Sequence, residues 1–370
     1  MAKLGEIATY INGYAFKPQD WSDEGIPIIR IQDLTGNSYQ ANRYNGEYAS
    51  KYEVNDGDVL ISWSASLGVY IWHGEKAVLN QHIFKVVFDK ERISKDFFVH
   101  QVGLILENAA SDAHGATMKH LTKPVFDALP FYLPPYEKQC EIAEVLDKAT
   151  NLISLRKQQL SKLDELVKAR FVEMFGDPVK NTMDWEIKPL SELGELNRGV
   201  SKARPRNSPE LLGGPYPLIQ TGEVANAKTY ITSFNSTYSE KGLAQSKMWP
   251  KGTLCITIAA NIAQTSILTF DACFPDSVVG FISRNMTNEL FIHYWFSFFQ
   301  KILDEQAPQV AQKNINLKIL SELNVIAPPL SLQNRFAAFV ERVDQQKQTV
   351  QQSLEKLELM KKALMQEYFG

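Results

Sequence analysis

The most constraining feature of this 370-residue chain is a long internal repeat. Residues 129–176 align without a gap with residues 323–370. In each copy a Pro-Pro pair precedes a Gln and a long helical pattern, and each copy ends in Phe-Gly. A repeat of this length is typical of a duplicated structural unit. Upstream the repeat is looser and pairs residues 4–7 with 193–196, 27–30 with 217–220, and 57–62 with 252–257.

The repeat divides the chain into four consecutive parts. The two helical copies are similar to each other, whereas the two globular parts have diverged in sequence. We therefore expect the order globular part, helix, globular part, helix, rather than one continuous core. The expected parts are residues 1–133, 134–177, 178–327 and 328–370.

Both helical parts carry a heptad pattern. Apolar side chains recur at alternating spacings of four and three residues, although Arg156, Lys347 and Lys361 interrupt them. Each helix covers about 35 residues and therefore about 50 Å. Because a pseudo-twofold axis places equivalent helices antiparallel, we expect an antiparallel two-helix coiled coil. A helix pair inside one compact domain is the alternative. The expected seam residues are Ile142, Leu146, Ile153, Leu160, Leu163, Val340, Val343, Val350, Leu354 and Leu357.

The globular parts contain short runs of apolar, β-branched and aromatic residues broken by Gly, Asn, Asp and Pro. Such runs indicate short strands and turns. The expected fold class is α+β, with two similar mixed α/β domains and a pseudo-twofold internal repeat. We expect strands at residues 26–30, 58–62, 82–88 and 253–257, and helices at 95–107 and 288–304.

The composition excludes several protein classes. Hydrophobic residues make up 44% of the chain and charged residues 22%, which is typical of a globular protein rather than a disordered one. No apolar run is long enough for a bilayer span, and the first residues lack a signal-peptide core, so we expect a soluble, cytoplasmic protein. Three cysteines without CxxC spacing argue against a disulfide framework or a zinc site. The net charge of −3 is compatible with DNA binding, which depends on where Lys and Arg cluster.

We find no catalytic or cofactor motif in the sequence. A GxxxxGK[ST] phosphate loop and a GxGxxG turn are both missing. The stretch Leu133-Pro134-Pro135-Tyr136 is similar to the Asn/Asp-Pro-Pro-Tyr motif of adenine-N6 methyltransferases. However, Leu133 here, or Ala327 in the second copy, cannot accept a hydrogen bond from the target amine. We interpret the stretch as a rigid helix entry and expect a non-catalytic chain that itself binds no metal and no cofactor.

Candidates for DNA contact lie in both globular parts. Basic and amide side chains are interleaved with aromatic ones in the first part, and a basic segment spans residues 198–206 in the second. Arg can pair bidentately with guanine, and Asn or Gln with adenine. Residues 63–66 and 258–261 follow equivalent strands, so they are candidate reading loops, or else simple turns. The candidates are Lys17, Arg30, Gln32, Tyr39, Arg43, Trp63, Ser64, Ser66, Arg198, Lys202, Arg204, Arg206, Gln220 and Asn261.

Several of these segments resemble type I restriction-modification specificity subunits. Residues 3–7 (Lys-Leu-Gly-Glu-Ile), 13–16 (Gly-Tyr-Ala-Phe), 25–30 and 215–222 are similar to parts of the family's target recognition domains. The two Pro-Pro pairs, each followed by Gln and a long helix, resemble its helical spacer regions. The resemblance covers essentially the whole chain and makes residues 1–133 and 178–327 the recognition domains.

The resemblance implies a chain without catalytic residues that recognises double-stranded DNA. Each recognition domain would read one half of a bipartite site, and the helices would set the gap, with half-sites centred roughly 10 base pairs apart. Two modification subunits would bring S-adenosylmethionine and methylate adenine at N6. Two restriction subunits would add translocation and cleavage that depend on ATP and Mg²⁺.

Three rival functions are considered. The first is a specificity subunit that serves a type IIB-like enzyme. The second is a bivalent scaffold that binds protein or glycan through its two domains. The third is a self-contained nuclease or methyltransferase, but we expect no turnover by the purified chain with DNA and S-adenosylmethionine or Mg²⁺.

Overall fold

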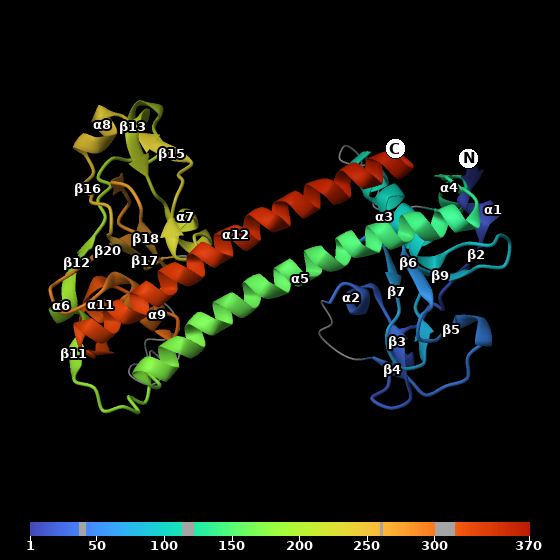
Figure 1. The fold of residues 1–370 in the computed structure, drawn as a ribbon, viewed down its shortest axis with the longest axis horizontal. Helices are drawn as coiled ribbons and strands as arrows, with labels where there is room; N and C mark the ends of the chain where they lie inside the picture. Colours follow the sequence, from blue (N-terminus) through green and yellow to red (C-terminus); the bar gives the residue numbers. More distant parts are fainter. Residues whose placement is uncertain (37–41, 113–121, 260–261, 300–314) are drawn as a thin grey trace. The chain divides into compact units, whose positions relative to one another are not determined.

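The computed structural model describes residues 1–36, 42–112, 122–259, 262–299 and 315–370. The chain forms two compact units (Figure 1). Unit 1 consists of Met1–Lys157 together with Gln352–Gly370, and unit 2 consists of Gln158–Gln351. Each unit therefore contains one strand-rich domain and parts of both long helices.

Unit 1 contains two four-stranded sheets. The first has the order β2-β9-β6-β7 and is antiparallel throughout, and the second has the order β4-β3-β8-β5 with β3 and β8 parallel. A short ladder between β1 and β10 completes the domain. The strands are β1 (Ala2–Lys3), β2 (Thr9–Asn12), β3 (Ile26–Ile29), β4 (Arg43–Tyr44), β5 (Glu53–Val54), β6 (Val59–Ser62), β7 (Gly68–Ile71), β8 (Ala77–Leu79), β9 (Ile83–Val87) and β10 (Pro130–Phe131).

Unit 2 has the same strand plan with one addition. Its first sheet has the order β12-β20-β17-β18-β14, its second sheet has the order β15-β13-β19-β16, and β11 pairs with β21. The strands are β11 (Ile187–Pro189), β12 (Gly194–Arg198), β13 (Leu212–Leu218), β14 (Tyr230–Ile231), β15 (Ser236–Tyr238), β16 (Met248–Trp249), β17 (Leu254–Thr257), β18 (Thr265–Leu268), β19 (Ala272–Cys273), β20 (Val278–Ser283) and β21 (Asn324–Ile326).

The two domains are structural repeats of each other. In each, the second sheet contains one parallel pair between two antiparallel ones, at the same places in the order. The prediction of two similar mixed α/β domains is thus confirmed, and the strands expected at 26–30, 58–62, 82–88 and 253–257 are β3, β6, β9 and β17. Unit 2 adds β14, which pairs in parallel with β18.

The inner positions of β6 and β17 in their sheets explain why these strands are mostly apolar. All four residues of each strand are buried. Alternate side chains point to opposite faces of a strand, so Val59 and Ile61 pack in the core that includes α3, while Leu60 packs in a second core on the other face. In unit 2, Leu254 and Cys255 are divided between two cores in the same way.

The shorter helices surround the sheets. They include α3 (Lys95–Asp112), which begins where the helix over 95–107 was expected and extends further. Others among the described residues are α1 (Leu4–Ile7), α2 (Ile31–Leu34), α4 (Lys123–Asp127), α6 (Leu190–Leu193), α7 (Thr221–Asn226), α8 (Glu240–Ala244), α9 (Glu289–Phe296), α11 (Leu317–Glu322), and the 3₁₀ turns η1 (Pro18–Asp20), η2 (Ser50–Tyr52) and η3 (Pro209–Leu211).

Helix α9 is shorter than the helix expected over 288–304. It ends at Phe296, because the chain tightens into a turn in which both the backbone N–H and the hydroxyl of Ser297 donate to the carbonyl of Tyr294. Residues 300–304 lie outside the described part of the chain. Within the described residues, none of the helices has the length and apolar character needed to span a membrane.

The long helices α5 (Tyr136–Phe175) and α12 (Leu330–Phe369) begin with the same buried anchor. The amides of Gln139 and Gln333 donate back to the carbonyls of Pro134 and Pro328 at 2.9 and 2.8 Å. The carbonyl oxygen of Gln139 accepts the backbone N–H of Ser94, and that of Gln333 accepts the N–H of Asn288. Both side chains are 1% exposed, and each both donates and accepts a hydrogen bond, so the repeated Gln ties each long helix to the start of α3 or α9.

Within each unit the two long helices pack antiparallel, as predicted. In unit 1, Arg156 of α5 donates to Ser353 of α12, and Lys157 pairs with Glu358. The C-terminal part of α12 shares a core with the first turns of α5, as Leu364 and Ile142 show, and Phe369 packs on Phe97 of α3 with ring centroids 5.4 Å apart. In unit 2, Asp164 of α5 pairs with Lys347 at 2.7 Å. The C-terminal end of α5 packs beside the first turns of α12 in the same unit.

The expected seam residues of the long helices differ in how deeply they are buried. Ile142, Leu146, Val340, Val343, Val350 and Leu354 are buried. Ile153, Leu160, Leu163 and Leu357 are partly exposed. Two of the three interrupting side chains make polar contacts across the pair: Arg156 donates to Ser353, and Lys347 pairs with Asp164.

Candidate nucleic-acid interface

Cations stacked on aromatic rings mark the surface of the first domain. The guanidinium of Arg30 lies 5.2 Å from the ring centroid of Trp21, and the ammonium of Lys51 lies 4.9 Å from that of Tyr52. Tyr14 packs edge-on against Tyr52 and is 44% exposed. Positive charge beside exposed rings suits nucleic acid, because the charge attracts phosphates and the rings stack on bases.

Other candidates of the first domain have different surroundings. Lys17 is exposed next to η1. Arg43 in β4 donates to the carbonyl of Gly25 and pairs with Glu75 at 2.7 Å, so its charge is partly neutralised. Gln32 lies partly exposed on α2. Tyr39 lies outside the described residues.

The candidate loop at residues 63–66 is held by a buried hydroxyl. Ser62 donates to the carbonyl of Ser66 at 2.6 Å and pulls the loop into a tight turn. The indole N–H of Trp63 donates to Asn12 at 3.1 Å, and Ser64 is 5% exposed. Ser66 is exposed, so it is the accessible polar side chain of this loop. In the matching loop, Ile258 is buried and Asn261 lies outside the described residues.

The basic segment of the second domain contains paired and unpaired cations. Arg206 pairs with Asp276 at 2.6 Å, and Arg204 is 3.8 Å from the same carboxylate. Arg198 at the end of β12 and Lys202 are exposed, and no ion pair to either is found among the described residues. The segment therefore presents less net charge than its sequence indicated.

Arg30 and Gln220 occupy the same place in the repeated fold, the corner where the chain leaves a strand of the second sheet and enters a short helix. Arg30 lies between β3 and α2, and Gln220 lies between β13 and α7. The backbone N–H of Arg30 donates to Asp33 at 2.8 Å, and that of Gln220 donates to Glu223 at 3.2 Å. Gln220 is exposed and Arg30 partly exposed, so the two domains present different side chains from an equivalent backbone.

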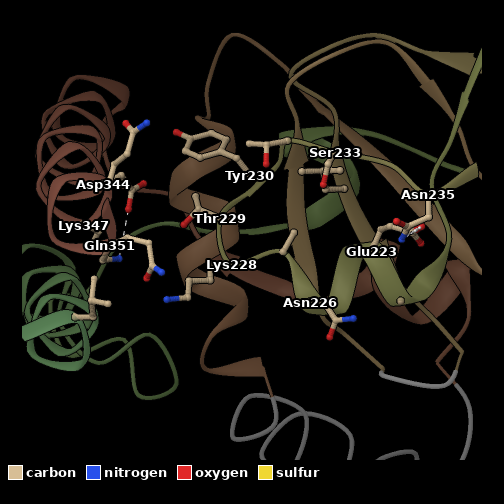
Figure 2. Close-up of a pocket in the computed structure, with 16 residues that line it drawn as sticks. Glu223, Asn226, Lys228, Thr229, Tyr230, Ser233, Asn235, Asp344, Lys347 and Gln351 are labelled. Atoms are coloured by element: carbon tan, nitrogen blue, oxygen red, sulfur yellow. Dashed lines mark hydrogen bonds and ion pairs between the residues drawn. The ribbon is translucent and has the colours of Figure 1, made fainter. Parts of the chain in front are cut away.

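A polar cavity of about 680 Å³ lies within unit 2, between residues 222–235 and α12. Figure 2 shows Asp344, Lys347 and Gln351 of α12 facing the segment that carries Lys228 and Tyr230. A second cavity of about 550 Å³ shares Lys228 and Lys347 with the first. The sequence did not predict these cavities, although Lys347 was visible as an interruption of the apolar seam.

Lys347 lines both cavities and pairs with two carboxylates. Its side chain is 13% exposed, and its ammonium lies 2.7 Å from Asp164 and 3.3 Å from Asp344. The second carboxylate oxygen of Asp344 is buried and has no hydrogen-bond partner among the described residues. Burial raises the pKa of Asp344, against the opposing effect of Lys347. Burial also raises the pKa of Tyr230, to about 12.

His293 is expected to make the stability of unit 2 depend on pH in the acidic range. Its Nδ1 lies 2.9 Å from the hydroxyl of Thr265, and burial, followed by the charge of Lys347, lowers its pKa to about 4. The unfolded chain therefore takes up this proton first as the pH falls. We expect unit 2 to lose about 2–3 kcal/mol between pH 6.5 and pH 4 through this group. Urea unfolding at stepped pH measures the loss, and His293→Gln should reduce it.

Asp344 supplies the contrasting variant for this experiment. Its raised pKa means that the folded state takes up a proton at higher pH than the unfolded chain, which adds stability as the pH falls. Asp344→Asn should therefore steepen the acid loss, whereas His293→Gln flattens it. Equal acid profiles for wild type and His293→Gln would exclude this role of the imidazole.

The three cysteines lie in the described part of the chain. Cys140 is exposed, Cys255 and Cys273 are buried, and all three are free. Within the described residues, no group of three or more His, Cys, Asp or Glu side chains is placed to hold a metal ion.

Comparisons with known proteins agree with this architecture. Residues 1–165 and 182–359 match the family model described as the type I restriction modification DNA specificity domain. The chain is 23% identical over 375 residues to the type I restriction enzyme EcoBI specificity subunit of Escherichia coli, covering 92% of this chain and 78% of the relative.

Solved structures show the same fold. The type I restriction-modification S subunit from M. genitalium matches with a TM-score of 0.59 and 14% identity, over 100% of this chain and 95% of that one. A second match is a structure described as the structural basis of complex assembly and conformational transition of the type I R-M system. Its TM-score is 0.59 and its identity 16%, over 100% of this chain and 96% of that one. The family model covers most of both strand-rich domains and both long helices. The chain therefore belongs to the family of type I restriction-modification DNA specificity subunits and is itself non-catalytic.

Proposed function

We propose that this subunit reads a bipartite DNA site, with one half-site contacted by each strand-rich domain. The observation that carries the proposal is the duplicated domain, which has the same strand order in both units but different side chains at matching corners. A duplicated reader whose contact residues have diverged is suited to recognising two different half-sites.

Within this role we assign residues 1–133 and 178–327 to the recognition domains and residues 134–177 and 328–370 to the helical spacers. The spacers would set the gap, with half-site centres roughly 10 base pairs apart. The antiparallel packing of α5 and α12 within each unit supports this role, because a paired helix resists bending better than a single one.

We assign phosphate and base contacts by the surroundings of each side chain. Lys17, Arg198 and Lys202 are exposed and suit phosphate contacts, which position the protein without reading sequence. Tyr39, Trp63, Ser66 and Asn261 remain candidates for contacts in or near the grooves. Gln32 is partly exposed and also remains a candidate. Ser64 is a weaker candidate because it is buried, and Arg43, Arg204 and Arg206 are weaker because each is paired with an acidic residue or a carbonyl.

We further propose that the chain acts in a complex with two modification subunits and two restriction subunits. The relative from Escherichia coli is named as the specificity subunit of a type I restriction enzyme, and one matching structure concerns the assembly of such a system. Adenine-N6 methylation with S-adenosylmethionine, and translocation and cleavage with ATP and Mg²⁺, would be functions of those partners. Action on cellular DNA would place the complex in the cytoplasm.

Methylome sequencing tests this function. The chain is expressed with its modification subunit in a host without adenine methylation, and N6-methyladenine is mapped. We expect one split motif with two defined half-sites and a fixed gap, lost when the gene for this chain is left out. Methylation that persists without the chain, or no motif with it, would contradict the proposal and favour a bivalent protein- or glycan-binding scaffold. A type IIB-like enzyme would instead cut on both sides of the motif without translocation.

A further inference from the structure

Among the candidate contacts, one pair stands out by its place in the repeated fold. We propose that Arg30 and Gln220 are matched base-reading residues, Arg30 for a guanine in one half-site and Gln220 for an adenine in the other. This inference rests on the proposed reading of a bipartite site and names the residues and base classes that decide part of its specificity.

The equivalence of the two positions comes from sheet topology. Strand β3 pairs in parallel with β8, and β13 pairs in parallel with β19, in sheets of the same order. The chain leaves each strand at the corner occupied by Arg30 or Gln220. In both domains the carboxylate of the residue three positions later accepts a hydrogen bond from the backbone N–H of the corner residue. The backbone is therefore fixed in the same way, while the side chain is free to differ.

Arg30 differs from Arg43 and Arg206 because no acidic side chain in the described residues is paired with it. The guanidinium of Arg30 lies over the ring of Trp21, and no carboxylate forms an ion pair with it in the part of the chain that the structure describes. By contrast, Arg43 pairs with Glu75, and Arg206 pairs with Asp276. This cation–π contact favours one position of the guanidinium and leaves its N–H donors available for a base.

The chemistry of the two side chains matches two different bases. Two parallel N–H donors of an arginine fit O6 and N7 of guanine, while the amide of a glutamine donates to N7 and accepts from N6 of adenine in the major groove. Both side chains are accessible, since Gln220 is exposed and Arg30 is partly exposed. A divergence from Arg to Gln at one duplicated position would therefore change the base that is read without changing the fold that presents it.

Exchange of the two side chains tests the inference. Full-length Arg30→Gln and Gln220→Arg variants are each expressed with the modification subunit, and N6-methyladenine is mapped as above. Arg30→Gln should lower methylation at wild-type sites at least about tenfold and replace one guanine of a single half-site by adenine or by no preference. Gln220→Arg should change an adenine in the other half-site towards guanine.

Matched variants separate base reading from structural effects. Arg92→Gln removes an exposed arginine that likewise lies over an aromatic ring, that of Tyr136, but is not among the candidate DNA contacts, so it should leave the motif unchanged. Arg30→Lys keeps the charge but loses the bidentate fork, so it should relax the same guanine position. It also serves as the test if Arg30→Gln fails to fold, which circular dichroism of the purified chain would show.

A second measurement uses the wild-type protein with altered DNA. Replacing the assigned guanine by 7-deazaguanine removes the N7 acceptor, and should weaken binding by the wild-type complex but not by the Arg30→Gln complex.

The outcomes distinguish this inference from the proposed function. If the wild type gives a split motif and both exchanges leave it unchanged, the assignment of Arg30 and Gln220 is wrong while the function stands. A uniform loss of methylation with no change of motif would also overturn it, because it would indicate phosphate contact or misfolding instead of base reading. If the wild type gives no motif at all, the proposed function itself fails.

Discussion

Removing one heptad from each long helix is expected to shorten the recognised gap by about three base pairs, because seven helical residues span about 10.5 Å and one base pair about 3.4 Å. The deletion with the best structural match removes residues 153–159 from α5 and 352–358 from α12. These segments include both partners of the Arg156–Ser353 hydrogen bond and of the Lys157–Glu358 ion pair. Both of these contacts are therefore removed whole, and the heptad phase of both helices is preserved.

Methylome sequencing measures the gap directly, since it reads the two half-sites and the distance between them. We expect both half-sites to keep their bases while the gap decreases. The matched control replaces residues 153–159 by the sequence of residues 347–353, their counterparts in the second copy, which changes side chains but not length. The gap of this control should be that of the wild type. A shortened protein that still methylates the wild-type gap would exclude a spacing role for the helices.

Phe175→Ala is expected to destabilise unit 2 by about 3–5 kcal/mol. Phe175 is fully buried at the end of α5, with ring centroids 4.9 Å from Phe171, 4.9 Å from Phe291 and 5.5 Å from Phe336. Truncation removes these aromatic contacts and leaves a cavity in a core that rigid strands and helices cannot close.

Urea unfolding followed by circular dichroism measures this loss, and hydrogen exchange shows whether it falls in unit 2. Phe369→Ala, the equivalent change at the end of α12, should cost unit 1 less, because Phe369 is partly exposed. Leu359→Ala is the surface control, since its side chain is 69% exposed, and should change stability by less than about 0.5 kcal/mol. Equal effects of Phe175→Ala and Leu359→Ala would show that the end of α5 is not part of the core.

The sequence by itself determined the duplication, the fold class and most of the regular elements. The gap-free repeat predicted two equivalent helices, and α5 and α12 both begin shortly after a Pro-Pro pair and end at the Phe of Phe-Gly. Strands such as β6 and β17 could be predicted because their signal is local: a short apolar run between turn residues. The antiparallel packing followed from symmetry, which a repeat reveals without coordinates.

The tertiary structure decided which side chains meet. Only the fold brings Asp276 to Arg204 and Arg206, and this pairing reduces the charge of a segment that looked uniformly basic. Only the fold shows that Lys347 pairs with Asp164, or that Arg30 and Gln220 occupy equivalent corners. These contacts join residues far apart in the chain, and their energies depend on distance and burial. Periodicity records only which face of its own element a residue occupies, so it predicted the strands and helices but not these pairings.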